Sequence, residues 1–257
     1  MFNGRKLEEL DLNAILRVAY GTRRRFSLGA GTRRARAAGG QRAINPGAGV
    51  QNATTYNERG IAKKKKGDLN GAMADFNQAI RLNPEFSAPY DNRGTVKRKQ
   101  GDLNGALADF DRAIRLDPLN AIAYKNRARA RQQKGDLNGA LADANEAIRL
   151  NPHYAQAYDA RARAKEGRGD LDGALADFNE AIRLNPKYAD AYNHRGTAKE
   201  RKGDLKGAIA DYNRAIQLDP KCAAAYKNRG NAEKGRGDLR GANADLNRAL
   251  QLGVTND

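Results

Sequence analysis

Apolar and polar positions alternate at helical spacing along most of this chain, and residues 87–120 show the pattern clearly. Apolar side chains recur there every three or four residues, a spacing that places them on one face of a helix. They are Leu103, Ala106, Leu107, Phe110, Ala113 and Ile114. The stretch before them keeps the same spacing with Tyr90, Arg93, Gly94 and Lys97. This segment is therefore expected to form two short helices.

Residues that end or begin helices separate the two. Gly101 can adopt the left-handed backbone conformation that ends the first helix, and the side chain of Asp102 can cap the free amides of the second. Pro118 stands just past the second helix and blocks its continuation. The order of these residues predicts a helix–turn–helix hairpin.

The hairpin pattern recurs with a fixed step of 34 residues. The tripeptide Gly-Asp-Leu begins at 67, 101, 135, 169, 203 and 237, and a tyrosine keeps the same step. One unit cannot bury its apolar stripe alone, so neighbours must stack into an array in which each unit touches the next. The units are 53–86, 87–120, 121–154, 155–188, 189–222 and 223–256.

A 34-residue unit with this pattern of small and large residues resembles the tetratricopeptide repeat, and the resemblance covers residues 53–256. It implies an all-α fold, a right-handed α-solenoid of six repeats, whose first helices line a concave groove. It also implies that peptide segments or partner proteins bind in that groove. We number the positions of each repeat from 1 to 34 and call its two helices A and B.

Positions 7 and 23 carry opposite charges in all six repeats, and at position 7 the family usually has leucine. The two positions lie at nearly the same height on the antiparallel helices, which predicts a partly buried Arg–Asp ladder. The alternative is that the Arg stems lie along the core and their guanidinium groups reach solvent. The ladder residues are Arg59, Arg93, Arg127, Arg161, Arg195 and Arg229 with Asp75, Asp109, Asp143, Asp177, Asp211 and Asp245.

The C-terminal end of the array keeps exposed apolar positions. Asn243 replaces the apolar residue of earlier repeats, while Leu246, Leu250 and Leu252 remain. Open solenoids usually need polar terminal units. Either Asn243 caps this end marginally, or the leucines meet a partner or a second copy of the chain.

Residues 1–52 lie outside the repeats. An apolar face within roughly 5–19 predicts an amphipathic helix in 1–20, which docks on the first repeat or on something else. Residues 21–52 are rich in Gly, Ala and Arg, which predicts a flexible basic linker. The run Thr22-Arg23-Arg24-Arg25-Phe26 superficially resembles a twin-arginine export signal, but no long uncharged apolar run follows it. We expect a cytoplasmic protein, with export and organelle targeting as alternatives.

Composition narrows the chemistry. The 47 basic against 30 acidic residues give a net charge of +17. The sequence contains no run of about 18 apolar residues, the length that a membrane-spanning helix needs. A single cysteine, Cys222, excludes an internal disulfide, and two histidines offer little for metal binding. No phosphate loop, zinc motif or nucleophile elbow occurs, and six equivalent capping aspartates indicate a scaffold. We therefore expect no catalytic residue, metal or cofactor.

Binding residues are expected where the resemblance directs side chains into the groove. Asparagine can bind a peptide backbone, and the cations can bind acidic side chains. Only Lys227 with Asn231 matches part of the family's carboxylate clamp, so that clamp is absent. The candidate residues are Asn92, Lys125, Asn126, Arg129, Arg163, His194, Lys227, Asn228 and Asn231.

The function expected from these features is that of a non-catalytic scaffold or adaptor, which holds a peptide or acidic segment of a partner protein. The alternative is a basic nucleic-acid accessory protein, because Lys and Arg cluster at the C-terminal ends of the A helices. Cations at these ends also complement the helix dipole, and single-strand binding needs exposed aromatic residues. Self-association through the last repeat is a further expectation.

Overall fold

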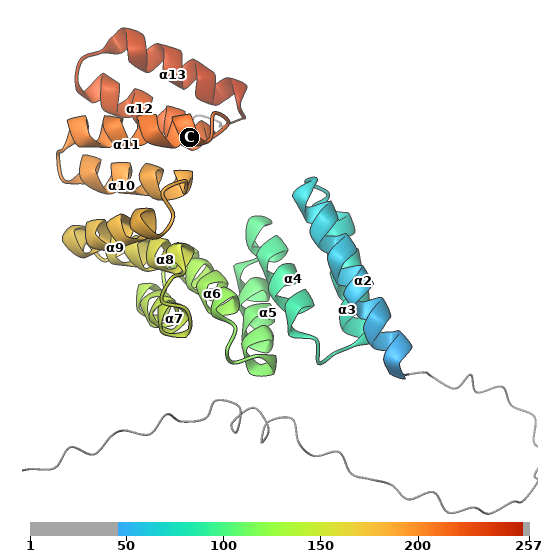
Figure 1. Cartoon of the computed structure of the whole chain (residues 1–257). Helices are drawn as coiled ribbons and strands as arrows, with labels where there is room; N and C mark the ends of the chain where they lie inside the picture. Colours follow the sequence, from blue (N-terminus) through green and yellow to red (C-terminus); the bar gives the residue numbers. More distant parts are fainter. Residues whose placement is uncertain (1–45, 254–257) are drawn as a thin grey trace, which may run out of the picture. The chain divides into compact units, whose positions relative to one another are not determined.

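The computed structural model describes residues 46–253, which form twelve α-helices and contain no strand. The helices pair into six antiparallel hairpins that follow one another in chain order (Figure 1). The A helices are α2 (Pro46–Lys65), α4 (Ser87–Lys99), α6 (Ala121–Lys134), α8 (Ala155–Gly167), α10 (Ala189–Arg201) and α12 (Ala223–Gly235). The B helices are α3 (Leu69–Leu82), α5 (Leu103–Leu116), α7 (Leu137–Leu150), α9 (Leu171–Leu184), α11 (Leu205–Leu218) and α13 (Leu239–Gln251).

The turn between the helices of each hairpin has the structure that its residues dictate. Gly101 has φ +85°, in the left-handed region, and Asp102 accepts a 2.8 Å hydrogen bond from the amide of Gly105. A Cβ atom on Gly105 would lie 2.1 Å from an Asp102 carboxylate oxygen, so a larger residue there would force the capping side chain to move. The same glycine conformation and the same aspartate cap occur in all six hairpins.

The first helix begins earlier than the sequence indicates. α2 starts at Pro46, so residues 46–52 are helical and do not belong to the linker expected over 21–52. Proline is favoured at the first helical position because its fixed φ suits the helix. Extending a formed helix is also easier than starting one. The expected helix in 1–20 and the linker up to residue 45 lie outside the described residues.

The apolar core is divided into small clusters, one at each hairpin or junction. Phe110 of α5 packs against Ala106 and against Ala130 of the next A helix. A Cβ on Gly94 would lie 2.8 Å from the Cε1 atom of Phe110, so glycine at this position lets the ring lie close to α4. Repeat three differs, since Ala144 occupies the position of that ring.

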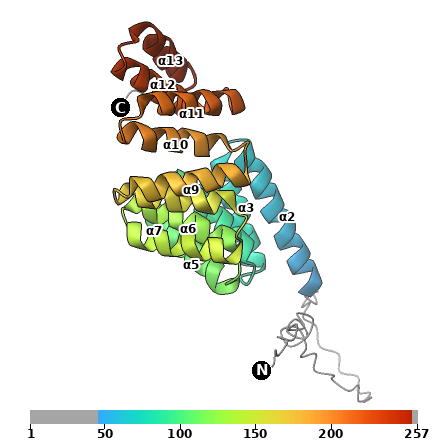
Figure 2. The same cartoon turned by 60° about the vertical axis from the view of Figure 1, so that its left-hand side comes forward.

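The array curves toward its A helices. Each A helix contacts the A helices before and after it, whereas no B helix contacts the next B helix in the described part of the chain. The A helices are therefore on the inner side of a superhelical stack, which Figure 2 shows from a second direction. None of the helices in 46–253 is long and apolar enough to cross a membrane.

Candidate functional site

The inner surface of the array, which we call the A-helix face, is formed by positions 5, 6, 9 and 12 of the A helices. Polar side chains join one A helix to the next across it, each from position 6 to position 5 of the preceding repeat. Asn92 donates to Asn57 over 3.1 Å, and Asn228 donates to Asn193 over 3.0 Å. The equivalent pairs are Asn126 with Asp91 and His194 with Asp159.

This series of contacts is interrupted between repeats three and four. Position 6 of repeat four is Ala160, so Lys125 at position 5 of repeat three has no polar partner there. Its Nζ atom donates to Asn126 over 2.6 Å and lies 5.8 Å from the centre of the Tyr154 ring. Burial, together with the positive charge of Arg129, lowers the pKa of Lys125 to about 8.

Three arginines surround this lysine, and we call Arg98, Lys125, Arg129 and Arg163 the central cation cluster. Burial and the charges of Arg129 and Arg163 lower the pKa of Arg98. Arg129 donates to Asp159 over 3.1 Å, while its buried Nε has no hydrogen-bond partner in the described structure. The hydrogen bonds that Arg98 and Arg163 make go to glutamine side chains, Gln133 and Gln132.

Two buried aspartates lie beside the cluster. Burial pushes the pKa of Asp159 upward, but His194, 2.6 Å away, and then Arg129 outweigh it and hold that pKa below its usual range. Asp91 is different, because burial raises its pKa more than the hydrogen bond from Asn126 and the charge of Lys125 lower it. The cluster therefore holds more positive charge than its neighbouring carboxylates offset.

The structure places all the expected binding residues on the A-helix face, but it uses them differently. Asn92, Asn126, Asn228 and His194 are engaged by neighbouring repeats. His194 in particular pairs with a buried carboxylate through Nδ1, which gives it a structural role. Lys125, Arg129 and Arg163 come together at the centre, whereas Lys227 and Asn231 belong to α12 of the last repeat.

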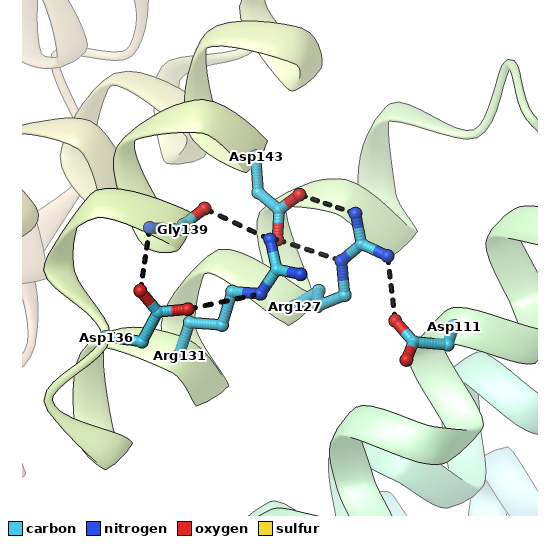
Figure 3. A network of polar contacts seen from close by, with 6 residues as sticks. All are labelled: Asp111, Arg127, Arg131, Asp136, Gly139 and Asp143. Carbon is cyan, nitrogen blue, oxygen red and sulfur yellow. Dashed lines mark hydrogen bonds and ion pairs between the residues drawn. The ribbon is translucent and has the colours of Figure 1, made fainter.

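The Arg and Asp residues of the expected ladder contact one another in every repeat. Arg127 donates from Nε and Nη2 to both oxygens of Asp143, over 2.9 and 2.6 Å (Figure 3). Its Nη1 also reaches Asp111, at position 25 of the preceding repeat, over 2.8 Å. Arg59 is 55% exposed, and the other five side chains are only 16–23% exposed. The ladder thus joins repeats to each other as well as helices within a repeat.

In the first five repeats, the aspartate of the ladder pair binds a second cation that sequence reasoning missed. In repeat three this is Arg131, whose Nη1 lies 2.8 Å from Asp143 (Figure 3). Position 11 is basic in the first five repeats, which was the available signal, but these cations were attributed to the helix dipole. In repeat six the position holds Glu233. The other four cations are Lys63, Lys97, Lys165 and Lys199.

Other reactive groups offer little chemistry. Cys222 is half-buried at the start of α12, and burial raises the pKa of its thiol. In residues 46–253 no group of three or more His, Cys, Asp or Glu side chains could hold a metal ion. What the described surface offers is charge and hydrogen-bond donors on the A-helix face, which suit binding of an acidic chain.

Comparisons with known proteins agree with this architecture. Models of the tetratricopeptide repeat match residues 53–86, 92–155 and 160–223. No curated protein matches the sequence. Among solved structures, a thermophilic TPR protein of Thermus thermophilus has TM-score 0.64 and 22% identity, covering 70% of this chain and 98% of its own. MamA has TM-score 0.50 and 28% identity, covering 62% and 93%. The APC/C hetero-tetramer Cut9-Hcn1 has TM-score 0.73 and 17% identity, covering 79% and 40%.

Proposed function

The chain belongs to the tetratricopeptide repeat family, and from this premise we propose that its A-helix face binds an extended acidic segment of a partner protein. Proteins of this family generally mediate protein–protein interactions as scaffolds and are typically not catalytic. The proposal therefore concerns which kind of partner this chain takes and where. The observation that carries it is the central cation cluster.

The cluster suits carboxylates because its donors are only partly used. Arg98 and Arg163 bond to neutral amides, so their charges remain available to a ligand. Arginine can bind a carboxylate through two parallel hydrogen bonds, which adds geometric specificity to the charge. Partial burial strengthens such a bond relative to one on an open surface. An Asp or Glu side chain of the partner is the ligand we assign to this place.

The test is a binding titration with short fluorescein-labelled peptides of alternating Glu and Ser, compared with peptides that carry Gln in place of Glu. We expect the full-length protein to prefer the Glu peptides. The double variant R98Q/R163Q should reduce this preference by about a hundredfold or more, since it removes two charge-assisted hydrogen bonds that contribute roughly 1.5 to 3 kcal/mol each. The control is R81Q/R115Q, which removes two exposed cations from B helices. Equal losses in the two double variants would reject the proposal.

The dependence of binding on pH tests Lys125 separately. Its amine is charged below pH 8 and becomes neutral above it, so affinity for the Glu peptides should fall as the pH rises through about 8 and beyond. Bound carboxylates stabilise the charged amine, so the decrease in affinity occurs at a higher pH when peptide is bound. In the variant K125R the charge persists, so this decrease in affinity should disappear.

A competition experiment with single-stranded DNA tests the nucleic-acid alternative. If the DNA displaces the peptide with a steep salt dependence and without regard to Glu, the nucleic-acid alternative is correct.

A further inference from the structure

The two ends of the array expose opposite halves of the junction that joins each repeat to the next. At the N-terminal end, Ala62 at position 10 of α2 is exposed. In the other five repeats the residue at position 10 is buried, and in four of them it packs in a cluster with the preceding B helix. Those residues are Val96, Ala130, Ala164, Ala198 and Ala232.

Within the described residues, Arg59 also lacks the preceding B helix that the later ladder arginines contact. The later ladder arginines donate from Nη1 to position 25 of the preceding repeat, as Arg93 does to Asn77 over 2.7 Å. Within residues 46–253, the hydrogen bonds of the Arg59 side chain go to Asp75 of its own hairpin. Its 55% exposure is the highest in the ladder. One donor of this residue therefore points to a place that a B helix would occupy.

The C-terminal end exposes the matching half. Asn247 of α13 stands at position 25, the acceptor position, and within residues 46–253 no ladder arginine follows it to donate a hydrogen bond. Leu250 at position 28 is 45% exposed, whereas Ile114 at the same position of repeat two is 8% exposed beneath the next A helix. Asn243 is also exposed, so it does not cover these residues. In the described part of the chain, no A helix covers the outer face of α13.

We propose that the occupant of each end is a second copy of this chain, joined head to tail through α13 of one copy and α2 of the next. Charge complementarity supports this choice. Within the array, position 6 bonds to position 5 of the preceding repeat. At a junction between copies, that rule brings Glu58 of one chain to Lys227 of the other, which are opposite charges. It also brings the free Arg59 donor to Asn247.

Such an interface is heterologous, so it leaves one free α2 face and one free α13 face in every assembly and can extend without closing. The A-helix face would continue across the junction and give a longer binding surface. The net charge of +17 opposes association at low salt. At about 0.15 M salt the Debye length is about 8 Å, so contacts inside the junction persist while long-range repulsion is screened.

Sedimentation velocity of the full chain at that salt tests the proposal with two blocking variants. A62E places a charge on the exposed face of α2, and L250E places one on the face of α13. Each variant alone should remain monomeric, the wild type should form a concentration-dependent series, and an equimolar mixture of the two should stop at dimers. The control L119E changes an apolar residue that is 75% exposed away from both faces, and it should behave as wild type.

A charge swap tests the register of the junction. E58K and K227E should each weaken association by up to about fivefold, and the double variant should regain it. A wild type that stays monomeric up to about 1 mM would overturn the proposal. Dimers of A62E alone would also overturn it, because they would show that two α13 faces pair with each other. Circular dichroism confirms that each variant keeps its helices.

Discussion

At the scale of single residues, ion pairs between charged side chains hold the hairpins together. Asp143 is almost buried, and it is neutralised by two cations, Arg127 at 2.6 Å and Arg131 at 2.8 Å. If one cation is lost, the other still neutralises the carboxylate. If both are lost, a buried carboxylate is left without a partner. Removing one partner of a buried ion pair strongly lowers the free energy of unfolding, because a charge is left buried alone. The intact pair itself adds little compared with well-packed apolar residues in its place. The two arginines should therefore act as a unit.

A double-mutant cycle measures this coupling. R127A alone should lower the free energy of unfolding by about 1 to 3 kcal/mol, since Asp143 keeps one cation. R127A/R131A should lower it by about 3 to 5 kcal/mol, as for a buried charge without a partner. Urea denaturation followed by circular dichroism gives both values. The control R149A removes an exposed ion pair with Glu146 and should unfold like the wild type. Strict additivity of the two losses would show that the arginines act independently.

At the scale of elements, the junction between repeats three and four is built for a closer approach of successive A helices, α6 and α8. Ala128, Ala144 and Ala160 form a cluster in which no side chain is larger than a methyl group. In repeats one, two and four a phenylalanine occupies the position of Ala144. Small residues let helix axes approach, and this brings Lys125 and Arg129 of α6 near α8. The central cation cluster therefore depends on the absence of an aromatic ring at the position of Ala144.

Restoring that ring should be harmful even though it matches the other repeats. A144F should destabilise the protein by about 1 to 3 kcal/mol, because the ring has no cavity to fill and must push α6 from α8. The reverse change F110A should cost about 3 to 5 kcal/mol by emptying a filled site. Thermal unfolding monitored by circular dichroism ranks the two variants. An unchanged or higher midpoint for A144F would mean that space for the ring exists after all.

At the scale of the whole molecule, the array is a series of near-identical units whose last member is different. Stability in such arrays is a sum of unit and neighbour terms, so an end repeat has one neighbour fewer. Repeat six also lacks the second cation, because Glu233 stands where the others have Lys or Arg. Its Oε2 atom is buried without a hydrogen-bond partner in the described structure. We expect opening of the array to begin at this end.

The titration of Glu233 makes this end sensitive to pH. Burial and the nearby Asp245 raise the pKa of Glu233, so the folded repeat favours the protonated form. Its contribution is present at low pH and is lost as the pH rises through the folded pKa. E233Q should remove that loss, and E233K should supply the missing partner of Asp245. Hydrogen exchange of α12 and α13, followed from below pH 4.5 up to neutral pH, measures both effects. Identical pH profiles for E233Q and the wild type would contradict this explanation.

The predictions from sequence succeeded where residues act within one hairpin or through a strict period. Gly101 and Asp102 specify their turn locally, and the step of 34 residues predicted the hairpins and their stacking. The start of α2 at Pro46 was missed because the linker composition of 21–52 carries no apolar stripe. Helix extension by neighbouring residues is cooperative, and composition alone does not record it.

The sequence by itself determined the unit, its turns and caps, and the need of each unit for a neighbour, because these follow from spacing and local backbone preferences. Only the tertiary structure decided which donors meet which acceptors across repeats. Arg129, for example, lies 3.3 Å from the hydroxyl of Tyr188, 59 residues away, and the pairing of position 6 with position 5 joins residues 35 apart in the sequence. Such contacts depend on the rotation and separation of stacked helices. These are set by the sizes of packed side chains such as Ala144, which no linear pattern of polar residues contains.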